Sequence, residues 1–130
     1  MKTSVSIEIA PGELIDKITI LEIKLERIKD GDKLANVRQE HDTLVQSRDA
    51  AIEATPELDL LGAELKAANE ALWDIEDDIR DCERQKDFGE PFVQLARNVY
   101  ISNDKRAALK REINELLGSS LIEEKSYAVY

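Results

Sequence analysis

Residues 58–82 read LDLLGAELKAANEALWDIEDDIRDC, and this stretch decides the fold class. Apolar or small side chains recur in it at alternating steps of 3 and 4 residues: Leu58, Leu61, Leu65, Ala68, Leu72, Ile75, Ile79 and Cys82. Such a heptad repeat is typical of a long helix with a narrow apolar seam that packs against partner helices. We refer to these positions as the seam. They predict an all-α protein, but they name no substrate.

The stretches before the seam predict two more helices. The helix over about 12–29 carries apolar residues on more than one side, which is typical of a central helix in a bundle. A second helix covers roughly 33–54, and Pro56 starts the seam helix of about 57–86. Because the link before Pro56 is short, the sequence predicts that these two helices fold back antiparallel as a long, coiled-coil-like hairpin.

The remaining sequence predicts shorter elements. A helix begins near Pro91 and breaks at Ile101, and a new helix starts at the capping residues of 102–104 and ends before Gly118. Val5–Ile9 and the end of the tail, 127–130, alternate or carry β-branched and aromatic residues. We therefore expect one domain over residues 1–130: an antiparallel helical bundle with a small two-stranded ribbon joining its termini.

Composition restricts the partners and the location. The chain of 130 residues has a net charge of −10 and a pI near 4.6, so we expect neither nucleic acid nor membrane as a partner. The N-terminus lacks the apolar region of a signal peptide, and no apolar run approaches the length of a membrane span. A single cysteine, Cys82, excludes an internal disulfide and fits a reducing compartment. These features predict a cytoplasmic protein.

Catalytic patterns are sparse. The only histidine, His41, falls on the apolar side of its helix and is interpreted as a packed residue. The chain has no glycine-rich phosphate loop, CxxC pair or His-Glu metal motif, so we expect no catalytic residue, no cofactor and no metal site. One alternative stays open, because carboxylates spaced i, i+3 can bind magnesium in all-helical nucleotide pyrophosphatases. The pairs of this kind are Asp74 and Asp77, Asp78 and Asp81, and Glu112 and Glu115.

A basic stretch in this acidic chain suggests an anion-binding pocket. Residues 94–111 contain five basic residues and one acid, and Arg80 flanks the seam on the neighbouring helix. Arginine side chains that converge inside a bundle can hold a carboxylate or phosphate through two donors. The candidate residues are Arg80, Arg97, Asn98, Tyr100, Asn103, Arg106 and Lys110. The alternative is an ion-pair network, in which these cations bind acids such as those of 74–81.

Three blocks resemble a bacterial family known only as a domain of unknown function. They are PGELIDKITILEIKLERI at 11–28, LWDIEDDIR at 72–80 and LARNVYISNDKRAALKREINELLGSSLIEEKSYAVY at 95–130, which cover about half of the chain. The resemblance implies a small helical protein, with members sometimes encoded beside glycosyltransferase or surface-polysaccharide genes. It implies no activity and no catalytic residue.

A second resemblance, of architecture alone, is to the helical chorismate mutases. Their first helix also carries an Ile-Asp pair, matched here by Leu14-Ile15-Asp16-Lys17, but their later Asp-x-x-Arg-Glu set and closing glutamine have no counterpart in this chain. Two hypotheses about function therefore compete. The first is a non-catalytic interaction or regulatory module, linked to surface-polysaccharide assembly by the family resemblance. The second is a small helical enzyme or binder of an anionic metabolite. We also expect a homodimer, because part of the seam lacks an internal partner, and the sequence leaves any other protein partner unknown.

Overall fold

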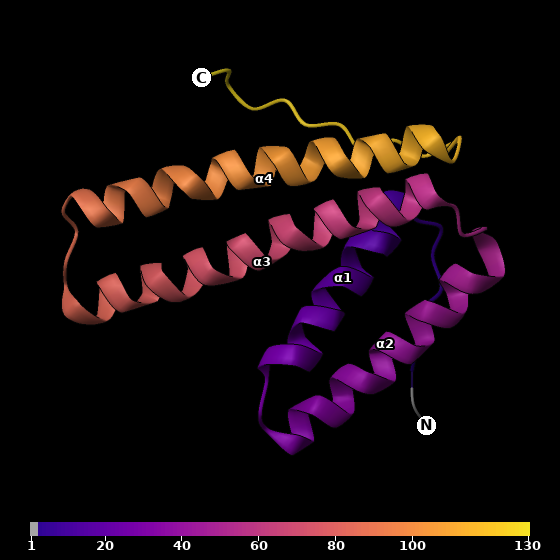
Figure 1. The fold of residues 1–130 in the computed structure, drawn as a ribbon, viewed down its shortest axis with the longest axis horizontal. Helices are drawn as coiled ribbons and strands as arrows, with labels where there is room; N and C mark the ends of the chain where they lie inside the picture. Colours follow the sequence, from indigo (N-terminus) through magenta and orange to yellow (C-terminus); the bar gives the residue numbers. More distant parts are fainter. Residues whose placement is uncertain (1–2) are drawn as a thin grey trace.

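The computed structural model describes residues 3–130 and confirms the all-α bundle. Its helices are α1 (Pro11–Arg27), α2 (Gly31–Ala51), α3 (Pro56–Gln85) and α4 (Glu90–Leu116), shown in Figure 1. Proline occupies the first turn of α1, α3 and α4, where its missing N–H costs no hydrogen bond. The predicted helix starts lie within a few residues of these bounds, because Pro and Gly mark most of them.

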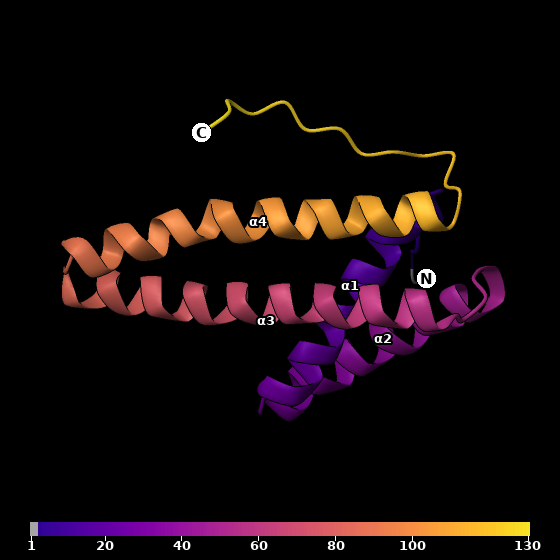
Figure 2. The same ribbon diagram turned by 45° about the horizontal axis from the view of Figure 1, so that its top comes forward.

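The long hairpin of the bundle consists of α3 and α4, which lie antiparallel along their whole length (Figures 1 and 2). Lys86 ends α3 in the left-handed conformation, with φ of 56°, and its N–H binds the Cys82 and Glu83 carbonyl groups. The chain then reverses and α4 begins at Glu90. Along this hairpin the seam residues Leu65 and Ala68 belong to the same buried core as residues of α4.

The predicted pairing of the second and third helices was wrong. Within the described residues, α2 packs against α1 alone, and α3 takes α4 as its neighbour. The link between α2 and α3 leaves Ile52 and Thr55 in extended conformations, so α2 turns away at an angle (Figure 1). The broad apolar face of α1 gives α2 a partner of its own. Val37, at 9% exposed, is the one buried residue of α2.

The predicted break at Ile101 was also wrong, because α4 runs uninterrupted from Glu90 to Leu116. Ser102, Asn103 and Asp104 lie inside this helix, although their side chains are common at helix starts. No glycine or proline occurs between residues 92 and 117. Helix α4 also packs along α3, and such tertiary packing outweighs weak local capping preferences.

The predicted ribbon does not form, because residues 3–130 contain no strand. Val5 and Ile7 are exposed, and the C-terminal tail of 119–130 instead runs back along α4 (Figure 2). Gly118, with φ of 64°, allows the reversal. At its end, the Tyr130 hydroxyl donates a hydrogen bond of 2.6 Å to Asp104.

Helix α1 crosses one end of the α3–α4 hairpin, and the core lies at this crossing (Figure 2). The buried apolar residues there are Ile15 of α1, Leu58, Leu65 and Ala68 of α3, and Leu109 and Ile113 of α4. Beyond the crossing, the hairpin continues without cover from α1 or α2 (Figure 1). We call this projecting part, residues 75–101, the distal hairpin.

Candidate functional site

A buried polar centre joins α1, α3 and α4 at their crossing. Asp16 of α1 is 1% exposed and accepts two hydrogen bonds from the Arg106 guanidinium, from Nε at 2.8 Å and Nη2 at 2.5 Å. Asn69 of α3 donates to the Asp16 carboxylate at 2.9 Å and to the Thr19 hydroxyl at 3.0 Å. The Thr19 hydroxyl itself donates to the Asp16 carbonyl at 2.7 Å. The four side chains therefore form a closed network.

Electrostatics hold this network in its charged form. Burial alone would raise the pKa of Asp16, but hydrogen bonds from Arg106 and Asn69 and the charges of Arg106 and Lys110 bring that pKa below its ordinary value. The hydrogen bond to Asp16 in turn raises the pKa of Arg106. Among the described residues, every buried side-chain nitrogen and oxygen has a hydrogen-bond partner. Asp16 is thus an ionised carboxylate whose two oxygens both accept hydrogen bonds, which suits a structural role better than proton transfer.

A second group of contacts fixes the start of α1 against α4. The Gly12 N–H donates to Asn114 Oδ1 at 2.7 Å. Lys110 Nζ lies 2.6 Å from Glu13 and 3.0 Å from Glu123 of the tail. Burial would lower the pKa of Lys110, but these two carboxylates raise it overall. Lys110 of α4 thus binds both the start of α1 and the C-terminal tail.

The candidate anion-binding cations fall into two groups. Arg106 and Lys110 come together at the crossing, and each binds acids of this chain. Arg80 lies on the distal hairpin, is largely exposed and pairs with Glu76 one turn earlier. Arg97 is exposed and its nearest polar partner is Gln94, at 3.4 Å. The contacts of Arg80, Arg106 and Lys110 match the ion-pair alternative, whereas Arg97 contacts an uncharged side chain.

The uncharged candidates are also distributed along α4. Asn98 accepts a hydrogen bond of 3.0 Å from Gln94. The Tyr100 ring packs edge-on against Tyr130, with centroids 5.0 Å apart, and Asn103 is half-buried nearby in sequence. The sequence interpretation missed Asp16, the partner of Arg106, and Asn69, which donates a hydrogen bond to Asp16. The signal was present for Asp16, which is a charged residue between Ile15 and Ile18 on an apolar helix face.

The carboxylate pairs of α3 and α4 do not assemble into a larger ligand set. In the part of the chain that the structure describes, no three His, Cys, Asp or Glu side chains lie close enough together to hold a metal ion. Arg27 of α1 instead binds Asp74 at 2.5 Å and contacts the Trp73 ring. Arg84 pairs with Asp81 three residues earlier, and Arg80 pairs with Glu76 four residues earlier.

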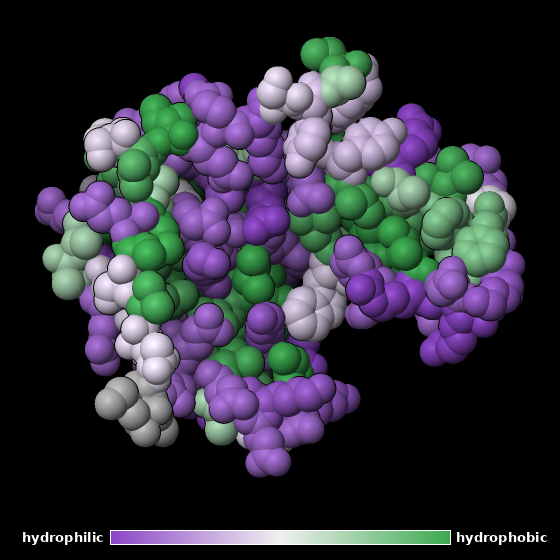
Figure 3. Space-filling view, turned by 180° about the vertical axis from the view of Figure 1, so that it is seen from behind, coloured by the Kyte–Doolittle hydropathy of each residue, from purple (hydrophilic) through white to green (hydrophobic). Residues whose placement is uncertain are grey.

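Burial decreases along the hairpin from the crossing to the tip. Leu65 and Ile113 at the crossing are 0% exposed. The seam residues of the distal hairpin, Ile75, Ile79 and Cys82, are only half-buried. Further apolar side chains there are exposed, namely Phe88, Val93, Tyr100 and Ile101. Figure 3 shows an apolar patch over this part of the molecule, on the right of the view, framed by hydrophilic residues.

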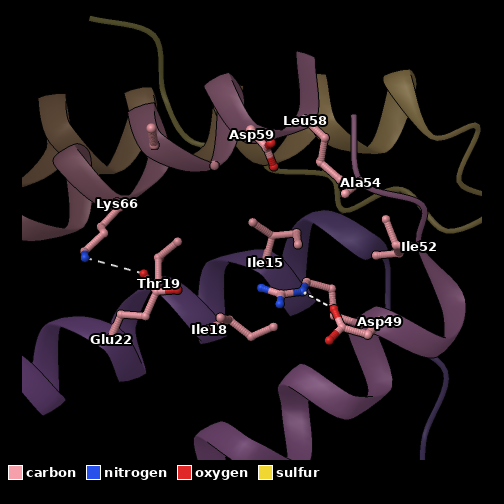
Figure 4. Close-up of a pocket in the computed structure, with 13 residues that line it drawn as sticks. Ile15, Ile18, Thr19, Glu22, Asp49, Ile52, Ala54, Leu58, Asp59 and Lys66 are labelled. Atoms are coloured by element: carbon pink, nitrogen blue, oxygen red, sulfur yellow. Dashed lines mark hydrogen bonds and ion pairs between the residues drawn. The ribbon is translucent and has the colours of Figure 1, made fainter. Parts of the chain in front are cut away.

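A cavity of about 400 Å³ opens where α1, the end of α2 and the start of α3 meet (Figure 4). Its apolar wall contains Ile15 and Ile18 of α1, Ile52 after α2, and Leu58 of α3. The cavity exists because α2 and α3 both pack against α1 but diverge from each other at an angle. Its size is in the range of small-molecule sites.

Charged residues of both signs surround this cavity. Lys66 Nζ bridges Glu26 at 2.6 Å and Glu22 at 3.4 Å, and the Glu26 hydrogen bond is the main reason that its pKa is raised. Arg48 pairs through Nε with the adjacent Asp49 at 3.0 Å. Asp59, in the first turn of α3, has no ion pair within residues 3–130.

A family model described as a family of unknown function, DUF6165, matches residues 5–130. The chain belongs to the DUF6165 family. This DUF6165 chain matches no curated protein and no solved structure. None of its described helices combines the length and hydropathy that a membrane span requires.

Proposed function

We propose that the chain is a non-catalytic helical interaction module and that the distal hairpin is its docking surface. The observation that carries the proposal is the change in burial along one continuous seam. Ile113 and Leu65 are fully enclosed at the crossing, whereas Ile75, Ile79 and Cys82 stay half-open. An apolar patch with a polar rim is typical of an interaction site.

The state of the polar residues supports an interaction role over an enzymatic one. Asp16, Arg106 and Lys110 are buried or part-buried charged residues of the crossing, and each is neutralised by an opposite charge of the same chain. A general base or nucleophile must lie within reach of a substrate and be in the protonation state that the reaction needs. The anion-binding enzyme hypothesis would first require these ion pairs to open.

A second copy of the chain is the partner that we propose. Two antiparallel helices leave their shared seam open on one side, and a second hairpin closes it as a four-helix bundle. A two-fold arrangement would place Ile79 and Cys82 of each copy in one shared apolar layer. The family resemblance adds a setting, surface-polysaccharide assembly, and the lone cysteine suits a cytoplasmic location. Both belong to the proposal.

Sedimentation equilibrium and cysteine crosslinking test the dimer. We expect a dimer at about 50 µM, a concentration at which a micromolar affinity gives mostly complex. A short bismaleimide should link Cys82 to its counterpart, slowly at neutral pH and faster at alkaline pH, because the pKa of this thiol is raised. Ile79→Glu should give a folded monomer, since the core at the crossing stays intact.

The matched control is Ala71→Glu, which adds the same charge at an exposed position of α3 before the distal hairpin. It should dimerise like the unmodified chain. A monomer at about 50 µM without crosslinking, or equal dimerisation of Ile79→Glu, would exclude a second copy as the occupant.

A further inference from the structure

We infer that the cavity between α1, α2 and α3 binds a small zwitterion with an apolar body, the chemistry of a free hydrophobic amino acid. This site is separate from the distal hairpin and shares no residue with it. It also contains none of the residues of the basic stretch 94–111. The inference therefore stands apart from the proposed interaction role.

The wall of the cavity provides for the apolar body. Ile15, Ile18, Ile52 and Leu58 supply branched aliphatic side chains from three segments of the chain. Gly62 and Ala63 line the α3 side, where larger side chains would occupy the space. A side chain at Gly62 would meet only Ile15 Cγ2, at 3.8 Å, within 4 Å of its Cβ. The space beside Gly62 is therefore unfilled by the chain.

Arg48 provides for a carboxylate. It interrupts the apolar side of α2 and lines the cavity, with its side chain 32% exposed. Its one ion pair uses Nε and the adjacent, largely exposed Asp49. No other hydrogen bond of this guanidinium occurs within residues 3–130. Its remaining N–H groups can therefore hold a ligand carboxylate through two parallel hydrogen bonds.

Asp59 provides for an ammonium group. Figure 4 places Asp59 on the α3 side of the cavity and Asp49 on the α2 side, with Ile15 between them. Asp59 lacks an ion pair in the described chain, whereas the cavity's other cation, Lys66, is already held by Glu22 and Glu26. A purely anionic ligand would meet Glu22, Asp49 and Asp59 at the rim. A ligand with both charges can pair its carboxylate with Arg48 and its ammonium group with Asp59, since both residues line the cavity, and this favours a zwitterion over a simple anion.

Binding can be measured with L-phenylalanine and L-leucine as probes. Chemical-shift titration of the amides of 48–66 in the intact chain should give saturable changes at up to about 10 mM ligand, the range of millimolar affinity. Phenethylamine lacks the carboxylate and hydrocinnamate lacks the ammonium group. Each should bind at least about tenfold more weakly than L-phenylalanine.

Variants identify the residues responsible. Arg48→Gln should weaken L-phenylalanine binding while leaving phenethylamine binding unchanged. Asp59→Asn should also weaken L-phenylalanine binding, but it should leave hydrocinnamate binding unweakened. Gly62→Leu should abolish binding by filling the cavity, and Ala67→Leu, on the exposed face of α3, is its control.

The inference fails if neither amino acid produces saturable shifts in the unmodified chain. It also fails if Arg48→Gln and Asp59→Asn both retain full affinity, or if the two single-charge analogues bind as well as L-phenylalanine. Arg48→Gln and Asp59→Asn change exposed or half-exposed side chains, so both variants should fold. They therefore keep the test valid even if Gly62→Leu does not fold.

Discussion

Asp16 and Arg106 lie 90 residues apart in the chain, and their side chains meet through two parallel hydrogen bonds at the crossing of α1 and α4. Asp16 is almost fully buried, whereas the Arg106 side chain is 29% exposed. The carboxylate of the pair thus lies inside the fold, and the guanidinium lies closer to solvent. Its two planar groups fix both the distance and the rotation of α1 relative to the hairpin.

We expect removal of the Asp16 charge to destabilise the fold strongly. Asp16→Asn keeps the shape of the side chain but leaves Arg106 without its counter-charge, and breaking a buried pair in this way costs about 3–5 kcal/mol. Urea unfolding monitored by circular dichroism measures the loss. The double variant Asp16→Met, Arg106→Met should recover part of it, and equal stability of Asp16→Asn and the unmodified chain would contradict the role of the pair.

The same pair predicts a loss of stability in acid. The pKa of Asp16 is lowered in the folded protein from its ordinary value of 3.8, so the unfolded chain takes up the proton first as the pH falls. The contribution is complete above the ordinary pKa and is lost as the pH falls toward the folded pKa. The free energy of unfolding between about pH 2 and 6 should fall less steeply in Asp16→Asn than in the unmodified chain.

Gly12 should tolerate no side chain. A Cβ there would lie 2.4 Å from the Lys110 carbonyl oxygen and 2.8 Å from Asn114 Oδ1, so Gly12→Ala must push α1 away from α4. We expect a loss of about 1–3 kcal/mol from overpacking. Gly31→Ala is the control, because nothing lies within 4 Å of its Cβ. Thermal unfolding should separate the two variants, and a similar melting temperature for both would argue against this close approach.

Truncations along the seam should have unequal costs. Leu65→Ala removes a side chain that is 0% exposed and should cost about 2–5 kcal/mol. Ile79→Ala removes a half-buried side chain and should cost less in the isolated chain. If the proposed dimer forms, the cost of Ile79→Ala should grow with protein concentration, which unfolding at several concentrations will show.

Cys82 should react slowly with thiol reagents at neutral pH. Partial burial, and then the charges of Asp87, Asp78 and Asp81, raise the pKa of its thiol above the ordinary value of 9.0. Because the thiolate is the nucleophile, the pH profile of maleimide labelling should lie at higher pH than that of a free cysteine. Asp78→Asn should move this profile back toward lower pH. A profile that matches free cysteine would contradict the environment described for Cys82.

Local sequence patterns predicted the helices well but did not predict which helices pair. The spacing of Leu58 to Cys82 required a long helix with one apolar seam, and that seam is present. Periodicity describes one face of one helix and is silent about the partner, so α2 was assigned to a place that α4 occupies. The break at Ile101 failed for a related reason, since capping residues act only where packing does not continue the helix.

The candidate site was harder to predict, because its contacts are distant in sequence. Arg106 and Lys110 were singled out by charge as an anion site, which stays a prediction, and nothing near them in the chain indicates that Asp16 and Glu13 are their partners. Arg80 shows the opposite case, because its partner Glu76 lies one turn away and the i, i+4 spacing is legible. The cavity arises from the angle between α2 and α3, which no residue pattern records.

The isolation of α2 has a consequence for how the molecule opens. This helix buries Val37 alone and contacts α1 alone among the described helices. Its detachment would leave the Asp16 network and the core of α1, α3 and α4 in place. Such a weakly attached segment forms its own low-energy opening unit. Amide hydrogens of α2 should therefore exchange with solvent well before those around Leu65 and Ile113, by an opening that spares the rest of the chain.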